Sequence, residues 1–148
     1  MSDANTGGCL CGAVRFDLSE KPTRYDACHC GMCRKFSGGI ELGIEISPDI
    51  IVWTGEEHIQ TYASSEWAER GFCKICGSSL FWRMTASGPS QGFLSLSAGS
   101  LDSLDGLVLE KEIYIDHKPD SYAFSGTRKQ MTEAEVVAAF NAPAGDSQ

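Results

Sequence analysis

The sequence has no long apolar run. Residues 1–8 contain no apolar core of the kind that a signal peptide carries, and no stretch of the chain is long enough to span a bilayer. Internal repeats and linker-like segments are also missing. We therefore expect a soluble, cytoplasmic protein with one domain over residues 1–148, whose core covers about residues 7–125.

Positive charge is scarce as well. Twelve Lys and Arg residues oppose 20 Asp and Glu residues, so the formal net charge is −8. A chain of that sign repels phosphate backbones, which argues against nucleic acid as a partner. Arg34, Lys35 and Lys74 lie beside cysteines, and their simplest role is to offset thiolate charge. Without a membrane-spanning stretch, we expect no membrane partner either.

Cysteine, by contrast, is abundant for a chain of 148 residues. The seven cysteines form a triplet and two pairs: Cys28, Cys30 and Cys33; Cys9 and Cys11; Cys73 and Cys76. Closely spaced thiols in a reducing compartment are typical metal ligands. The alternative of three disulfides and a spare thiol would need an export signal, which the sequence lacks.

The two pairs predict a closed, structural zinc site. Four thiolates complete a tetrahedral zinc site, and we assign Cys9, Cys11, Cys73 and Cys76 to it. On an extended chain, the C-x-C spacing of the first pair would point both thiols to one face. The C-x-x-C spacing of the second pair predicts a knuckle, in which Gly77 tolerates the turn. Two unrelated buried pairs are the alternative.

The triplet Cys28, Cys30 and Cys33 predicts a second, open zinc site. No fourth cysteine remains in the chain, so one coordination position is free for a substrate or a water molecule. A sulfur-rich site favours a further thiolate there. His29 is a candidate fourth ligand, but on an extended segment it would point away, which favours an orienting role.

Two other histidines carry weaker signals. His58 is most simply a surface or packing residue, and His117 is most simply a turn residue before Pro119. The sequence shows no Asp, Glu or His arrangement that identifies a general base, so the route of a proton is not predicted.

Apolar and polar residues alternate in many short segments, which predicts a mainly antiparallel β fold. The expected strands are residues 14–18, 40–46, 50–54, 59–63, 68–72, 79–84, 93–98 and 107–115. Residues 1–8 are expected to be loose, and residues 34–37 to form one helical turn. A capping box of Thr132 and Glu135 predicts a short helix over residues 134–140 that stops before Pro143, with a disordered end at 144–148.

The motifs together resemble the glutathione-dependent formaldehyde-activating enzyme family, also called the CENP-V/GFA family. The similarity covers roughly residues 7–122, and its motifs lie at residues 7–14, 28–34, 71–81, 98–102 and 115–119. The cysteine pattern is highly specific. One departure follows His117-Lys118-Pro119: relatives often carry a Trp soon after it, whereas this chain has Tyr122. If that aromatic residue lines the pocket, we expect a different substrate choice.

This resemblance implies an Mss4-like β fold with zinc knuckles and two zinc ions per chain. It assigns the outer pairs to the structural zinc and the Cys28, Cys30 and Cys33 triplet to the catalytic zinc, and it raises the weight on His117 as a speculative catalytic residue. The family activity is a carbon–sulfur lyase reaction that joins glutathione and formaldehyde as S-hydroxymethylglutathione. Glutathione would be the co-substrate, and the partner a small-molecule thiol or thiol–aldehyde adduct.

Three functions compete at this stage. The first is a zinc-dependent carbon–sulfur lyase. The second is a non-catalytic glutathione carrier or a zinc-stabilised binding module that uses the same face. The third is a purely structural zinc domain, which leaves the three-thiol site without a role. A test for rate acceleration by the zinc-loaded protein separates the first function from the second.

Overall fold

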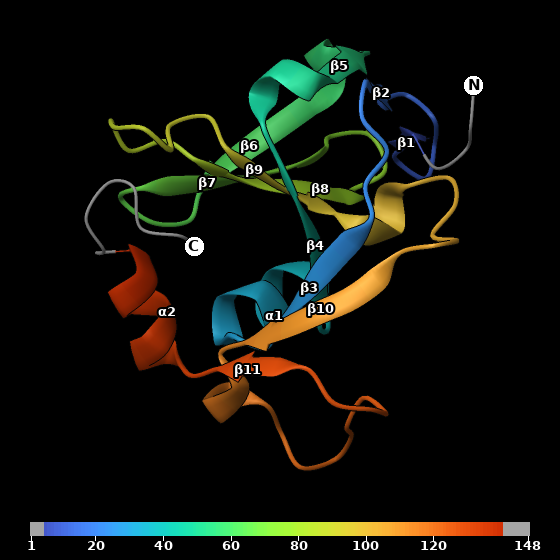
Figure 1. Ribbon diagram of the computed structural model, residues 1–148. Helices are drawn as coiled ribbons and strands as arrows, with labels where there is room; N and C mark the ends of the chain where they lie inside the picture. The colour runs from blue at the N-terminus through green and yellow to red at the C-terminus, as the bar shows by residue number, and fades with distance from the viewer. Residues whose placement is uncertain (1–4, 141–148) are drawn as a thin grey trace. The chain divides into compact units, whose positions relative to one another are not determined.

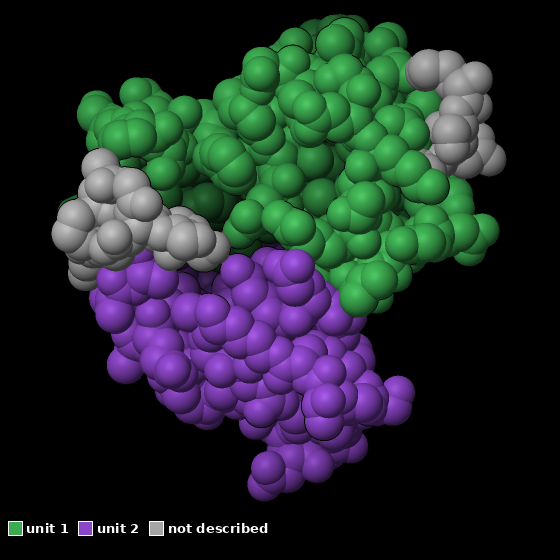
Figure 2. All heavy atoms as spheres, viewed as in Figure 1, with its two compact units in different colours: residues 1–25, 42–108 green, residues 26–41, 109–148 purple. Residues whose placement is uncertain are grey.

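Strands dominate the computed structural model, which describes residues 5–140. Within these residues the chain forms eleven β-strands, two α-helices and short 3₁₀ turns, so the prediction of a mainly β fold is confirmed (Figure 1). The chain divides into two compact units (Figure 2). The first unit consists of Met1–Tyr25 and Leu42–Val108, and the second consists of Asp26–Glu41 and Leu109–Gln148. The expectation of one domain stays a prediction.

The first unit contains a small sheet and a larger antiparallel run of strands. The small sheet has the order β1-β2-β5, with β1 at Thr6–Gly8, β2 at Arg15–Leu18 and β5 at Ile51–Thr54. The larger run has the order β4-β9-β8-β7-β6. Its strands are β4 (Glu41–Ile46), β6 (Ile59–Ala63), β7 (Ala68–Cys73), β8 (Ser79–Met84) and β9 (Leu94–Ser97).

Apolar side chains alternate with polar ones along these strands, and the apolar ones form the core of the first unit. The apolar side chains of Phe16, Leu80 and Leu96 are at most 1% exposed. Phe16 meets Trp53 edge to face, with ring centroids 5.5 Å apart. Each fully buried side chain of this size contributes about 1.5–3 kcal/mol to folding. Gly71 packs so closely that an added Cβ would lie 2.2 Å from the Phe81 ring, so only glycine fits there.

The second unit is built from two distant segments of the chain. Its strands have the order β11-β10-β3, with β3 at Arg24–Cys28, β10 at Val108–Ile113 and β11 at Lys129–Met131. Two helices belong to it, α1 at Gly31–Ser37 and α2 at Glu133–Phe140. The predicted capping box of α2 is present, since Thr132 Oγ1 accepts from the Glu135 N–H and Glu135 Oε1 accepts from the Thr132 N–H. Residues 143–148 lie outside the described part of the chain.

Every predicted strand segment contains a strand, but the prediction for the N-terminal residues was wrong as far as the structure describes them. Residues 6–8 are not loose, because they form β1 and pair with β2. Gly7 allows the close packing there, since an added Cβ would lie 2.3 Å from the Ser100 carbonyl oxygen. The helical turn predicted at residues 34–37 is confirmed and belongs to the longer helix α1, which begins at Gly31 because Cys30 caps it. Strand β11 was not predicted, and it pairs parallel to β10, whereas β6, β7, β8 and β9 pair antiparallel with their neighbours in the first unit.

Neither of the two helices described between residues 5 and 140 is long and apolar enough to cross a bilayer.

Candidate metal centres

The first cysteine pair lies in a tight turn at the end of β1. The Gly12 N–H donates to the Cys9 carbonyl over 3.2 Å, and Gly12 has a φ of 82°, in the left-handed region. The extended geometry expected for this C-x-C pair is therefore wrong, because Gly12 allows the chain to turn instead. The turn leaves the Leu10 side chain 90% exposed.

The second pair lies in the predicted knuckle between β7 and β8. The Gly77 N–H donates to the Cys73 carbonyl over 2.8 Å, and Gly77 also has a φ of 82°. A hydrogen bond ties the two turns together, from the Leu10 N–H to Ser78 Oγ at 3.0 Å. Both turns belong to the first unit, so two segments far apart in the sequence present their thiols to each other.

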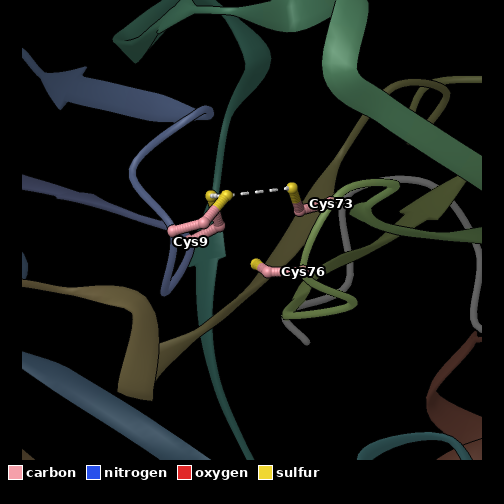
Figure 3. A group of neighbouring side chains, drawn as sticks. Cys9, Cys73 and Cys76 are labelled. Atoms are coloured by element: carbon pink, nitrogen blue, oxygen red, sulfur yellow. Dashed lines mark hydrogen bonds between the residues drawn. The ribbon is translucent and has the colours of Figure 1, made fainter.

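The four sulfurs of these turns form one group whose ligand atoms all lie within 4.8 Å of one another. Cys9 Sγ is 3.6 Å from Cys11 Sγ, and Cys11 Sγ is 3.8 Å from Cys73 Sγ. A tetrahedral zinc with bonds of about 2.3 Å would space its sulfurs by about 3.8 Å. Figure 3 shows Cys9, Cys73 and Cys76 around the common space. This donor set fits a closed tetrahedral metal site.

Polar groups of the protein lie within hydrogen-bonding distance of three sulfurs of this group. Cys9 Sγ accepts from the Val14 N–H at 3.2 Å, and Cys73 Sγ accepts from the Ile75 N–H at 3.4 Å. The Ser78 hydroxyl lies 3.2 Å from Cys76 Sγ, and hydrogen bonds from its side chain and backbone lower the pKa of Cys76 to about 5. Donors of this kind orient thiolates for a metal.

The triplet forms a second group, at the junction of β3 and α1. Cys28 ends β3, Cys30 is the N-cap of α1, and Cys33 lies in the first turn of the helix. The Cys30 sulfur accepts from the Cys33 N–H at 3.3 Å. Their three sulfurs lie within 4.8 Å of one another, and no fourth His, Cys, Asp or Glu among residues 5–140 joins the group. The group can hold a metal ion and leave a coordination position open.

The three thiols of this group are strongly coupled. Hydrogen bonds with Cys30 and Cys33, together with burial and the charge on both neighbours, raise the pKa of Cys28 far above its usual range. Neighbouring negative charges disfavour ionisation of a further thiol. A bound cation reverses this effect, so the chemistry of the donor set fits a metal.

His29 points away from the cysteines on either side of it, as expected for an extended segment. Its side chain is fully buried, and its Nε2–H donates to the Glu112 carboxylate over 2.8 Å. The Tyr122 hydroxyl lies 3.2 Å from Nδ1. Both ring nitrogens are therefore occupied, and His29 is not a ligand. Tyr122, the aromatic residue that follows the His117-Lys118-Pro119 motif, therefore contacts this histidine.

Sequence reasoning missed Tyr114, which lies beside the triplet. The His29 N–H donates to the Ile113 carbonyl over 3.1 Å, which brings the next residue, Tyr114, alongside Cys28 and Cys30. Burial and the negative charges of Cys30 and Cys28 raise the pKa of the Tyr114 phenol. Its φ of 57° is the only positive value for a non-glycine residue in the described chain. Strained backbone of this kind is often found at functional sites.

The other two histidines belong to neither cysteine group. His117 Nε2 is 2.7 Å from Glu133 Oε1, and the imidazole packs against the Tyr114 ring with centroids 5.6 Å apart. It does not belong to the triplet group, and the catalytic role considered for it stays a prediction. His58 is the last residue of a 3₁₀ turn in the first unit, and its Nε2 lies 3.6 Å from Glu57 Oε1.

Comparisons with known proteins agree with this arrangement. Residues 4–117 match a family model described as glutathione-dependent formaldehyde-activating enzyme. An uncharacterized lyase of Schizosaccharomyces pombe is 30% identical over 131 residues, which cover 88% of this chain and 93% of that protein.

Two further matches are more limited. A Halomonas elongata protein, provisionally named a glutathione-dependent formaldehyde-activating enzyme, is 39% identical over 83 residues, and the match spans 53% of its length. The crystal structure of a Rhodobacter sphaeroides protein superposes with a TM-score of 0.53 at 22% identity, covering 68% of this chain and 90% of that one. This last likeness supports the fold alone.

Proposed function

The chain belongs to the glutathione-dependent formaldehyde-activating enzyme family, and from this membership we propose that it is a zinc-dependent carbon–sulfur lyase acting on a thiol–aldehyde adduct. The family resemblance found in the cysteine pattern is thereby confirmed. The lyase expectation is supported by this membership and by the name of the yeast relative. The reaction we favour joins glutathione and formaldehyde as S-hydroxymethylglutathione.

One observation carries the proposal: three sulfurs at the β3–α1 junction face one point, and no fourth ligand from the described residues joins them. We assign zinc to both cysteine groups, because thiolate-only donor sets suit this metal. Cys9, Cys11, Cys73 and Cys76 would hold the structural ion, and Cys28, Cys30 and Cys33 the ion at the open position. Zinc there would supply a site that takes the thiolate of the substrate.

The reaction needs no oxidant. The glutathione S–H bond breaks, a C–S bond forms to the aldehyde carbon, and the carbonyl oxygen becomes a hydroxyl by taking up a proton. The reverse direction breaks the same C–S bond. The raised pKa of Tyr114 keeps its phenol protonated at neutral pH, so this side chain can donate a hydrogen bond to the oxygen on which negative charge develops.

The position of His117 adds a second polar group to this region. Its ring packs against Tyr114 in a tilted arrangement, and its Nε2 lies 2.7 Å from Glu133 Oε1. We propose that His117 and Glu133 together orient the Tyr114 ring. His117 would then act by positioning Tyr114. A group that acts on Tyr114 in this way positions the donor and does not itself contact the reacting atoms.

We further place the protein in the cytoplasm, with a small-molecule thiol as its partner. The cysteines of each group converge on a common centre and none is paired as a disulfide. Free thiols of this density require a reducing compartment, and glutathione is the abundant thiol of such compartments.

Calorimetry with glutathione on the zinc-loaded protein tests the proposal. Binding through a thiolate should tighten between about pH 6.5 and 8.5, as the pH approaches the free thiol pKa of about 8.5. Cys30→Ser should weaken binding, and S-methylglutathione, which has no thiol to ionise, should bind poorly. Equal binding of both compounds would contradict thiolate coordination.

A rate assay then separates the enzyme from a carrier. The zinc-loaded protein should accelerate both formation and breakdown of S-hydroxymethylglutathione, since a catalyst speeds both directions. Tight glutathione binding without any acceleration would identify a non-catalytic carrier instead.

A further inference from the structure

The strongest unassigned feature of the second unit is a buried carboxylate. Glu112 on β10 is 2% exposed, yet both of its oxygens are hydrogen-bonded. Oε1 accepts from His29 Nε2 at 2.8 Å, and Oε2 accepts from Arg128 Nη1 at 2.8 Å and from Gln130 Nε2 at 3.4 Å. A buried charge is costly to keep unless it is fully paired, as here.

His29 is hydrogen-bonded through both ring nitrogens and through its main-chain N–H. The ring is held by Glu112 on one side and by the Tyr122 hydroxyl on the other. The Phe124 ring lies against it, with centroids 6.2 Å apart. The His29 N–H is bonded to the Ile113 carbonyl at 3.1 Å. Since His29 stands between Cys28 and Cys30, this anchoring also sets the main chain that carries both thiols.

Four of the residues in this network come from one segment, which we call the clasp: Tyr122, Phe124, Arg128 and Gln130. The parallel pairing of β11 with β10 places Gln130 opposite Glu112, and Arg128 stacks over Phe124 at 5.7 Å. All four residues follow residue 117, where the match to the family model ends. The clasp therefore lies outside the part of the chain that the family model matches.

We propose that Glu112 and the clasp are positioning residues for the three-cysteine centre. They hold the segment 28–30 in the extended conformation that directs His29 to one side and the two cysteines to the other. A site fixed before the metal arrives loses less conformational freedom on binding, and its affinity is higher. The inference rests on the metal site of the proposed function and needs no assumption about the reaction.

The effect should resemble that of other groups that orient metal ligands without touching the metal. Removing such a group typically lowers metal affinity by about 10–100-fold. Tyr122→Phe is the mildest variant, because it deletes one hydroxyl and leaves the ring in place. Glu112→Gln is the strongest, because it removes the charge that pairs with Arg128.

The test is a chelator competition on the full-length protein loaded with Zn²⁺, with the four-cysteine centre as internal reference. Tyr122→Phe and Glu112→Gln should each lower the Zn²⁺ affinity of the three-cysteine centre by about 10–100-fold. The affinity of the four-cysteine centre should stay unchanged. The matched controls are Tyr62→Phe, an exposed tyrosine on β6, and Glu110→Gln, an exposed glutamate on β10. Both controls should bind two metals as the parent protein does.

A second readout separates positioning from a general loss of stability. Co²⁺ in place of Zn²⁺ gives visible bands that report ligand geometry. In the clasp variants the bands of the three-cysteine centre should shift, and Arg128→Lys should shift them less than Arg128→Ala, because the charge near Glu112 is kept.

Two results would overturn the inference. One is unchanged affinity and an unchanged cobalt spectrum in Tyr122→Phe and Arg128→Ala. The other is an equal loss of both metals, which indicates a structural role only. Should Glu112→Gln fail to fold, Tyr122→Phe and Arg128→Ala still decide the matter. The readouts are metal affinity and the cobalt spectrum, so they do not depend on glutathione binding. If glutathione failed to bind, the proposed function would be contradicted and this inference could still be tested.

Discussion

Arg15 and Asp102 lie 87 residues apart in the sequence and form a two-bond ion pair in the first unit. Arg15 Nη1 donates to Asp102 Oδ1 at 3.0 Å, and Nη2 donates to Oδ2 at 2.5 Å. The Thr6 hydroxyl adds a third bond to the same carboxylate at 2.6 Å. The carboxylate therefore links β1, which precedes the first cysteine pair, to β2, which follows it.

This pair leads to a prediction on pH. Hydrogen bonds from Arg15, and then from Thr6, lower the pKa of Asp102. A carboxyl group with a lowered folded-state pKa stabilises the fold above its ordinary pKa near 3.8, and this stabilisation is lost as the pH falls through the lower folded value. Asp102→Asn should therefore cost stability at neutral pH and nothing at strongly acidic pH.

The expected cost is about 1 kcal/mol or less, because the two side chains are 42% and 31% exposed and solvent screens the pair. Urea unfolding at about pH 7 and about pH 3 measures it. Asp105→Asn, at an exposed position of the neighbouring loop, is the control. If the free energy of unfolding differed between Asp102→Asn and the parent by the same amount at both pH values, the ionised Asp102 carboxylate would not be the source of the stabilisation.

A second prediction concerns the different roles of the two cysteine groups. Cys73→Ala should unfold or aggregate the protein, because metal binding in such sites contributes on the order of 10–16 kcal/mol and a whole domain is stable by about 5–15 kcal/mol. Cys30→Ala should keep the fold and lose the second metal. Thermal unfolding of both variants provides the measurement.

A refinement follows from the capping role of Cys30. Because its sulfur accepts from the Cys33 N–H, Cys30→Ala should cost about 1 kcal/mol through α1 alone, whereas Cys30→Ser keeps a capping oxygen. Equal melting of Cys73→Ala and Cys30→Ala would refute the division into a structural and an open site.

The third prediction is the metal content. We expect two zinc ions per chain by elemental analysis, with the four-cysteine site the tighter, because it has four ligands and the other group has three. A mild chelator should remove one ion first and leave the fold intact. A single tightly held ion that persists in Cys28→Ala would argue against the second site.

The fourth prediction concerns Tyr114. Tyr114→Phe removes only the hydroxyl, and phenylalanine meets the same backbone constraint at a φ of 57°. The loss of one hydrogen bond should lower kcat/KM by about tenfold, with both metals retained. Steady-state kinetics together with metal analysis check this. Tyr62→Phe serves as control, and an unchanged kcat/KM in Tyr114→Phe would remove the phenol from the mechanism.

Much of the fold could be predicted because local pattern and burial agree. Phe16 and Leu18 alternate with polar residues and both are buried, as the period of a strand requires. The structure also brings together the cysteines that the sequence assigned to each group, since close spacing limits which thiols can share a metal. The orientation of His29 followed from the extended chain between two ligands.

What the sequence could not indicate depends on long-range pairing. Strand β11 is only three residues long, Lys129–Met131, and without an apolar alternation its partner cannot be read locally. Glu112 falls in a segment of charged residues, and its burial depends on Arg128, 16 positions later. Tyr114 gains its place from the pairing of His29 with Ile113, and a lone tyrosine carries no pattern.

The two-segment construction of the second unit sets an order of events during translation. The four ligands of the closed centre are all present once Cys76 has left the ribosome, whereas the residues that hold His29 are still to be made. At 5–20 residues per second, Arg128 emerges on the order of ten seconds after Cys33. A nascent chain can therefore bring the four-cysteine group together first, whereas the anchoring of His29 between Cys28 and Cys30 waits until Glu112, Tyr122 and Arg128 have been made.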